Sequence, residues 1–252
     1  MGQMIAWFSQ TFWALLRVGG FLMVVPIFGN QLVSRRIRVA MAVAIAIAIG
    51  PLLSPLPVIA EVTLDILLQA GFQLIAGIGL GFATMIFFQL FVVAGQFIGM
   101  QMGLGFAAMV DPGNGVQVTA LSQFFLMLVS MTFLAMNGHL VLLDVLITGF
   151  KQFPSGVGIS YSELAWTLAN FGGWMFVGGV LVALPAVISL LVVNLAFGVM
   201  SRSAPQLNVF SLGFPFSLVF GLVIVWFLIH GWLPQFDRLS RQFFDFTVIW
   251  MR

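Results

Sequence analysis

Few residues in this chain could carry acid–base chemistry. Arg17, His139 and Asp144 are ionisable residues that interrupt long apolar blocks. Such residues are costly in a bilayer and usually face a protein interior or water, so a coupled transport site is one hypothesis. His139 and Asp144, however, stand five positions apart, whereas neighbours on one helix face are three or four apart. The spacing disfavours a proton relay and favours a hydrogen bond from His139 to nearby backbone.

Catalysis has little support in the sequence. The patterns Gly-x-x-x-x-Gly-Lys-Ser, His-Glu-x-x-His and Gly-x-Ser-x-Gly are missing. The chain has 0 cysteines, which excludes a thiol nucleophile and a thiolate metal site. Its 7 acidic residues form no obvious pair, and its 2 histidines are too few for a zinc site. We therefore expect no enzyme activity, no cofactor and no metal.

The stretch Gly99–Val118 is rich in glycine and contains the turn signal Asp111-Pro112-Gly113. It is nevertheless too apolar for an ordinary solvated loop. At membrane depth, irregular backbone is tolerated only where protein buries it or where it lines a water-filled path. Two interpretations stay open from composition. One is a re-entrant plug or constriction in a pore, and the other is a helix–helix contact followed by a short external loop.

Composition indicates the class of protein. Of the 252 residues, 62% are hydrophobic and 6% are charged, whereas soluble domains carry about a quarter charged residues. A water-soluble fold could not cover its surface with so few charges, so we expect an integral membrane protein. The net charge is only +2, which argues against a nucleic-acid surface.

Six apolar blocks are predicted to form long helices, since about 20 residues cross a bilayer. Pro185 predicts a kink in the fifth block, and the fifth and sixth blocks are predicted to pair as a helical hairpin. From Pro234 onward, charged and aromatic residues mix, and Asp237 and Arg241 are four apart. This pattern predicts an amphipathic helix at the membrane interface or docked on a partner. The blocks cover residues 5–28, 39–53, 66–93, 120–149, 164–199 and 209–232.

Glycine spacing predicts close helix packing. Gly77 and Gly81 are four apart, and the same spacing recurs at Gly95, Gly99 and Gly103. Orientation is not settled, because the predicted loops on the two sides carry equal numbers of basic residues. Helices buried inside a larger assembly would escape that rule. The two sets are Arg35, Arg36, Arg38 and Arg202 against Lys151, Arg238, Arg241 and Arg252.

Three segments together resemble the FliR family of flagellar and type III secretion export-gate proteins. The first is Arg17-Val-Gly-Gly-Phe-Leu-Met-Val-Val-Pro-Ile-Phe-Gly, which leads into Arg35-Arg-Ile-Arg-Val. The second is Gln101-Met-Gly-Leu-Gly-Phe-Ala with Asp111-Pro-Gly, followed by Phe133-Leu-Ala-Met-Asn-Gly-His-Leu. The third is Leu184-Pro-Ala and then Asn194-Leu-Ala-Phe-Gly-Val-Met-Ser-Arg-Ser-Ala-Pro-Gln-Leu-Asn-Val-Phe-Ser-Leu-Gly-Phe-Pro. The resemblance covers nearly the whole chain, and its one departure is Ser34, where the family often has proline.

The resemblance implies an all-α integral membrane protein with about six long, kinked helices in tilted hairpins, a re-entrant plug loop and a C-terminal amphipathic helix. Residues 1–170, with the plug loop at 95–119, would resemble a FliP subunit. Residues 171–232 would resemble a FliQ hairpin, and residues 233–252 would form the amphipathic segment. One copy would assemble with FliP-like and FliQ-like subunits and an FlhB-like protein in the bacterial inner membrane, at the flagellar basal body, and unfolded proteins would pass through the pore.

The resemblance also places the plug in the central stretch, where Gly103 and Gly105 would bend the backbone. Phe106 and Met109 would add apolar surface that gates by dewetting, with plain packing as the alternative for Met102 and Met109. A purely structural scaffold is a further alternative for the whole chain. The predicted gate residues are Met100, Met102, Gly103, Gly105, Phe106, Met109, Asp111, Pro112 and Gly113. Those predicted for assembly or buried polar contacts are Arg17, Asn137, His139, Asp144, Arg202 and Asn208, and those for helix packing are Gly77, Gly81, Gly95 and Gly99.

Overall fold

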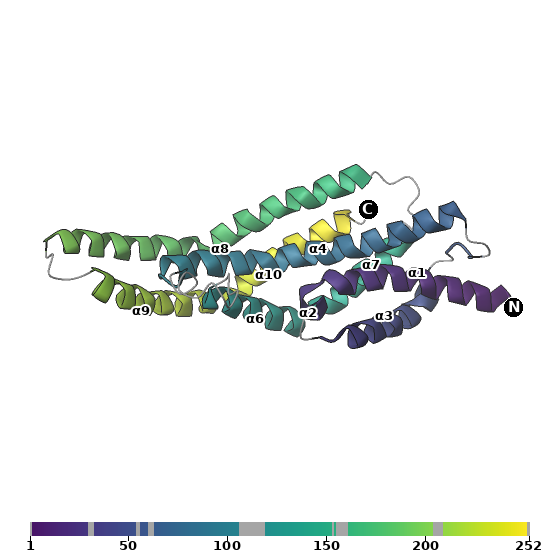
Figure 1. The fold of residues 1–252 in the computed structure, drawn as a ribbon, viewed down its shortest axis with the longest axis horizontal. Helices are drawn as coiled ribbons and strands as arrows, with labels where there is room; N and C mark the ends of the chain where they lie inside the picture. Colours follow the sequence, from purple (N-terminus) through teal and green to yellow (C-terminus); the bar gives the residue numbers. More distant parts are fainter. Residues whose placement is uncertain are drawn as a thin grey trace. The chain divides into compact units, whose positions relative to one another are not determined.

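All regular structure in the described part of the chain is helical (Figure 1). The computed structural model describes residues 2–29, 33–53, 56–59, 63–105, 119–152, 154, 161–203 and 209–250. The predicted all-α class is therefore confirmed. The helices are α1 (Gly2–Val24), α2 (Pro26–Gly29), α3 (Arg35–Ile49), the short 3-10 helix η1 (Gly50–Leu52), α4 (Leu64–Gln101), α6 (Ala120–Ala135), α7 (Gly138–Gln152), α8 (Tyr161–Ser203), α9 (Val209–His230) and α10 (Trp232–Trp250).

Three helical stretches are long and apolar enough to cross a membrane. They are Leu64–Gln101 in α4, Ser162–Met200 in α8 and Gly213–His230 in α9. Helices α6 and α7, bent by 68° at their break, count as a fourth if they form one broken span. The membrane class is confirmed, whereas the number of about six is not, because the described residues give three or four such helices. Helix α3 has only 15 residues, and α1 contains Arg17 and other polar residues that lower its hydropathy.

The chain packs as two compact units, each built from segments that are distant in sequence. The first unit comprises Met1–Phe87, Phe133–Gly172 and Gln242–Arg252, and the second comprises Phe88–Thr132 and Gly173–Arg241. Helices α4, α6, α8 and α10 therefore contribute residues to both. The division at residues 170 and 232 rests on the family resemblance and stays a prediction.

In the first unit, α1 packs on α4 with backbone against backbone. A Cβ atom at Gly77 would overlap the backbone of Arg17. A Cβ atom at Gly81 would lie 2.9 Å from the Phe21 carbonyl oxygen, and one at Gly20 of α1 would lie 2.7 Å from the Leu74 carbonyl oxygen of α4. Small residues allow such an approach between apolar helices. Gly77 and Gly81, which the sequence places four residues apart, therefore face α1.

Helix α10 is amphipathic, as predicted, and Arg241 Nε donates to Asp237 Oδ2 at 3.0 Å on its exposed side. Its buried side chains recur every three or four residues, which is the period of one helix face. The expectation that this apolar face meets the membrane interface or a partner is wrong, because this chain covers it. The buried apolar residues are Trp232, Phe236, Leu239, Phe243 and Trp250.

The contacts of α10 are made within each unit. In the second unit, the ring of Trp232 lies 5.1 Å from that of Phe91, and its Nε1 donates to Thr132 Oγ1 at 2.9 Å. In the first unit, the ring of Phe243 stacks on that of Phe87 at 4.8 Å. Aromatic pairs of this kind add to the stability that burial supplies. Helix α10 is therefore a core element of both units.

Candidate functional site

Helix α4 ends inside the glycine-rich stretch, in a defined cap. Beyond Gln101 the chain turns at Gly103, whose φ of 85° lies in the left-handed region that favours glycine. The Gly103 N–H donates to the Met100 carbonyl at 3.0 Å, and the Leu104 N–H donates to the Gly99 carbonyl at 2.9 Å. This pair of bonds is a Schellman motif, which satisfies carbonyls that a helix end leaves open. The glycine at 103 therefore sets the direction in which the chain leaves α4.

The chain resumes at Thr119, against the same end of α4. Thr119 caps α6, because its Oγ1 accepts the Ser122 N–H at 3.3 Å. Its own N–H donates to Gln96 Oε1 at 2.9 Å, and its Oγ1 donates to the Gly95 carbonyl at 3.4 Å. A Cβ atom at Gly99 would lie 2.9 Å from Thr119 Cβ. Gly95 and Gly99 thus leave room for the start of α6 directly on α4.

We call residues 95–105 and 119–122 the stem. The described chain turns away from α4 after Gln101, is described as far as residue 105 and resumes against α4 at residue 119, so both sides of the stem are held at one helix end. Of the predicted gate residues, Met100, Met102, Gly103 and Gly105 lie in the stem. The others lie outside the described residues, and their roles stay predictions. These are Phe106, Met109, Asp111, Pro112 and Gly113.

The hairpin of α8 and α9 holds the α4 side of the stem. Asn194 Nδ2 of α8 donates to the Gln101 carbonyl at 3.3 Å, one of the carbonyls at the helix end. Ser217 Oγ of α9 donates to Asn194 Oδ1 at 2.8 Å. Met102 is 1% exposed and fits against α9 where Gly221 has no side chain. We call the hydrogen-bonded chain of Ser217, Asn194 and the Gln101 carbonyl the polar clamp.

A pocket of about 320 Å³ opens beside the polar clamp. It brings three predicted gate residues together with two residues to which the sequence assigned no role, Asn194 and Ser217. Their only sequence signal is that they are polar residues within apolar helices. The pocket is lined by Met100, Gln101, Met102, Gly103, Asn194, Phe197, Gly198, Gly213, Phe214 and Ser217.

Arg17 belongs to the first unit and faces a protein interior, with 1% of its surface exposed. Its Nε donates to Gln73 Oε1 at 2.7 Å, and its guanidinium carbon lies 3.8 Å from the centre of the Phe150 ring. Gln73 Nε2 in turn donates to the Pro154 carbonyl at 2.9 Å. The charge-assisted hydrogen bond and the cation–π contact join α1 to α4 and α7.

Three of the other residues predicted to make assembly or buried polar contacts are not buried within this chain. Asn137, Asp144 and Arg202 are exposed, so a contact with a partner stays a prediction for them. Asn137 has a φ of 57° at the break between α6 and α7, a conformation that asparagine tolerates better than most residues. Asn208 lies outside the described residues.

His139 is half-buried at the start of α7 and lines an apolar pocket of about 160 Å³. Its Nδ1 atom is buried and has no hydrogen-bond partner among the described residues, so the expected bond to nearby backbone is not made at this nitrogen. Arg17 is bonded to Gln73, His139 lies among apolar side chains and Asp144 is exposed. These three different settings do not favour a coupled transport site.

Replacing Gly103 with alanine is expected to strain the turn by about 1–2 kcal/mol, because only glycine adopts the left-handed conformation without penalty. Gly105→Ala is the matched control, since a Cβ atom there would lie 3.8 Å from Met100 Cγ, an ordinary contact. We expect the melting temperature of the purified protein to fall by about 2–8 °C for the first variant only. Equal shifts in the two variants would contradict the cap described above.

Helices of membrane-spanning length and apolar composition define this chain as an all-α, multi-pass membrane protein. The model of the family described as "Bacterial export proteins, family 1" matches residues 8–243. The chain is 35% identical over 245 residues to "Flagellar biosynthetic protein FliR" of Escherichia coli strain K12, covering 96% of this chain and 93% of that protein. It is 32% identical over 244 residues to the protein of that name in Pectobacterium carotovorum (96% and 92%) and 27% identical over 231 residues to that of Bacillus subtilis strain 168 (89% and 88%). The chain belongs to the FliR family of bacterial export proteins.

Proposed function

We propose that this chain is a subunit of the flagellar type III export gate in the bacterial inner membrane. With FliP-like and FliQ-like subunits, and an FlhB-like protein at the entrance, it forms the pore through which unfolded flagellar proteins pass. The plug loop at residues 95–119 closes this pore. Family membership supports the role in export, and the names of the relatives support the flagellar system. The partners and the plug rest on the family resemblance and on the stem.

The observation that carries the proposal is the stem. Its two sides are fixed on one helix end, by the cap at Gly103 and by the hydrogen bonds of Thr119 to Gln96 and Gly95. A segment tied at one place can enter or leave a lumen without separating the helices that carry it. The polar clamp ties the same helix end to α8 and α9. A movement of α8 or α9 would therefore act on the helix end that carries the proposed plug.

Exposed apolar surface on α8 and α9 supports an assembly. Of the apolar stretch in α4, 67% is buried within this chain, compared with 33% in α8 and 22% in α9. Val192, Leu195 and Phe227 are each more than 60% exposed. Either lipid or neighbouring subunits must cover such surfaces in a membrane. FliP-like and FliQ-like subunits are the cover that we propose.

A single introduced thiol tests the position of the stem, because the chain has no cysteine of its own. Met100 and Met127 are exposed to 60% and 59%, so Met100→Cys and Met127→Cys form a matched pair. We expect an export substrate that carries one cysteine, stalled in the assembled gate and treated with a thiol oxidant, to form a disulfide with the thiol at position 100 and not with that at position 127. Equal cross-linking, or cross-linking at position 127 alone, would contradict a stem that faces the conduit.

A further inference from the structure

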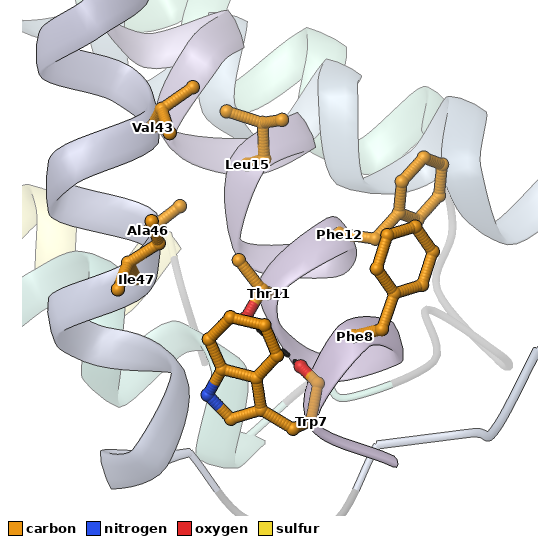
Figure 2. Close-up of a pocket in the computed structure, with 8 residues that line it drawn as sticks. All are labelled: Trp7, Phe8, Thr11, Phe12, Leu15, Val43, Ala46 and Ile47. Carbon is orange, nitrogen blue, oxygen red and sulfur yellow. Dashed lines mark hydrogen bonds between the residues drawn. The ribbon is translucent and has the colours of Figure 1, made fainter. Parts of the chain in front are cut away.

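Helices α1 and α3 of the first unit form an apolar groove (Figure 2). Helix α3 follows α2 and runs back alongside α1 (Figure 1). In Figure 2, Trp7, Thr11 and Leu15 of α1 lie on the side of α3. The Thr11 hydroxyl already donates to the Trp7 carbonyl at 2.9 Å, so the groove offers mainly apolar contact. It measures about 280 Å³ and is lined by Trp7, Phe8, Thr11, Phe12, Leu15, Val43, Ala46 and Ile47.

On α1, open space is also found beyond the groove, toward the start of α3. One turn beyond Leu15 comes Gly19, where a Cβ atom would meet nothing within 4 Å. On α3, Arg36 precedes Val43 by about two turns and Ile47 by about three turns, so the three share one face of the helix. Arg36 is exposed, and Val43 and Ile47 are 38% and 45% exposed. The apolar groove therefore has an exposed arginine on the same face of α3, about 10 Å along the helix axis from Val43.

The charges that α1 and α3 themselves carry are of one sign. Arg35, in the first turn of α3, is also exposed, whereas Arg38 is half-buried and its Nε donates to the Phe28 carbonyl at 3.0 Å. Neither α1 nor α3 contains an aspartate or a glutamate. A ligand that fits must therefore combine a long apolar part with an anionic group at one end. Guanidinium groups bind phosphate oxygens in a bidentate manner, and the start of a helix favours the same charge.

We propose that this groove binds an anionic phospholipid of the bilayer, with one acyl chain between α1 and α3 and the phosphate on Arg36. The stretch from Arg36 to Ile47 spans about 16 Å of helix axis, which suits an extended acyl chain. The bound lipid covers side chains that this chain leaves exposed, including Val43 and Ile47. The site is separate from the stem, and the proposed gate function does not depend on it.

The proposal is tested on the purified complex, reconstituted with equal amounts of phosphatidylglycerol and phosphatidylcholine and examined by native mass spectrometry. We expect phosphatidylglycerol to be retained in preference to phosphatidylcholine. Arg36→Gln should weaken this retention about tenfold, since hydrogen bonds to charged groups are among the strong ones. Arg238→Gln, at another exposed arginine, is the matched control and should change nothing. Equal retention of the two lipids, or retention unaffected by Arg36→Gln, would overturn the proposal.

A second variant separates lipid binding from folding. Gly19→Leu fills the open space beside the groove and should lower phosphatidylglycerol retention while leaving the melting temperature of the complex unchanged. Retention equal to that of the natural chain would count against the site. A photo-activated cross-linker placed at Val43 gives an independent readout. A lipid adduct supports the proposal, whereas an adduct to another polypeptide overturns it, because a subunit would then occupy the groove.

Discussion

Replacing Gly77 with alanine is expected to force α1 away from α4 and to destabilise the first unit by about 3 kcal/mol. The added Cβ atom would overlap the backbone of Arg17, and backbone cannot rotate aside as a side chain can. Arg17 would be displaced with it, which would weaken its hydrogen bond to Gln73 and its contact with Phe150. The melting temperature of the purified complex, followed by tryptophan fluorescence, should fall by about 6–12 °C.

The matched control for this change is Gly71→Ala on the same helix. A Cβ atom at Gly71 would meet nothing within 4 Å, so only the backbone preference changes. Alanine is favoured over glycine in a helix by up to about 1 kcal/mol, and we expect no loss of stability. Equal destabilisation by the two substitutions would show that α1 and α4 do not meet at Gly77.

The sequence predicted this contact in part. The four-residue spacing of Gly77 and Gly81 indicates a face that a second helix can approach closely. It cannot say which helix, because the partner, α1, lies more than 50 residues earlier in the chain. The break at Asn137-Gly138 was not predicted, because residues 120–149 were taken as one helical block, although Asn137 there adopts a left-handed conformation that few residue types accept. Local conformational preferences of this kind depend on the residue types at the position itself.

Other features depend on contacts that no local pattern specifies. Asn194 and Gln101 are 93 positions apart, and a lone asparagine in an apolar helix does not indicate which residue it will hydrogen-bond. The amphipathic pattern of α10 predicts one apolar face but not what covers it. The sequence therefore favoured lipid or a partner, whereas the structure places aromatic side chains of the same chain there. Periodicity predicts that one face of a helix is buried. Which residues cover that face depends on the packing of the whole chain.

Replacing residues 106–118 with a short Gly-Ser linker is expected to leave the export complex assembled but leaky to ions. The linker can close the gap, because Thr119 lies against Gly99 of the same stem. The cap at Gly103 and the polar clamp involve only retained residues, so the helices should keep their packing. Ion flux through vesicles containing the complex should rise well above that of vesicles with the natural chain.

The same replacement applied to residues 155–160 is the control, since it alters a connection of comparable kind at which we propose no plug. It should leave the vesicles tight. If both variants are tight, the segment is not a plug, and a purely structural scaffold becomes the better account of this chain. If both leak, the defect comes from looser assembly rather than from an open pore. A leak confined to the 106–118 variant is the result that a plug requires, because an apolar constriction blocks ions only while its side chains occupy the lumen.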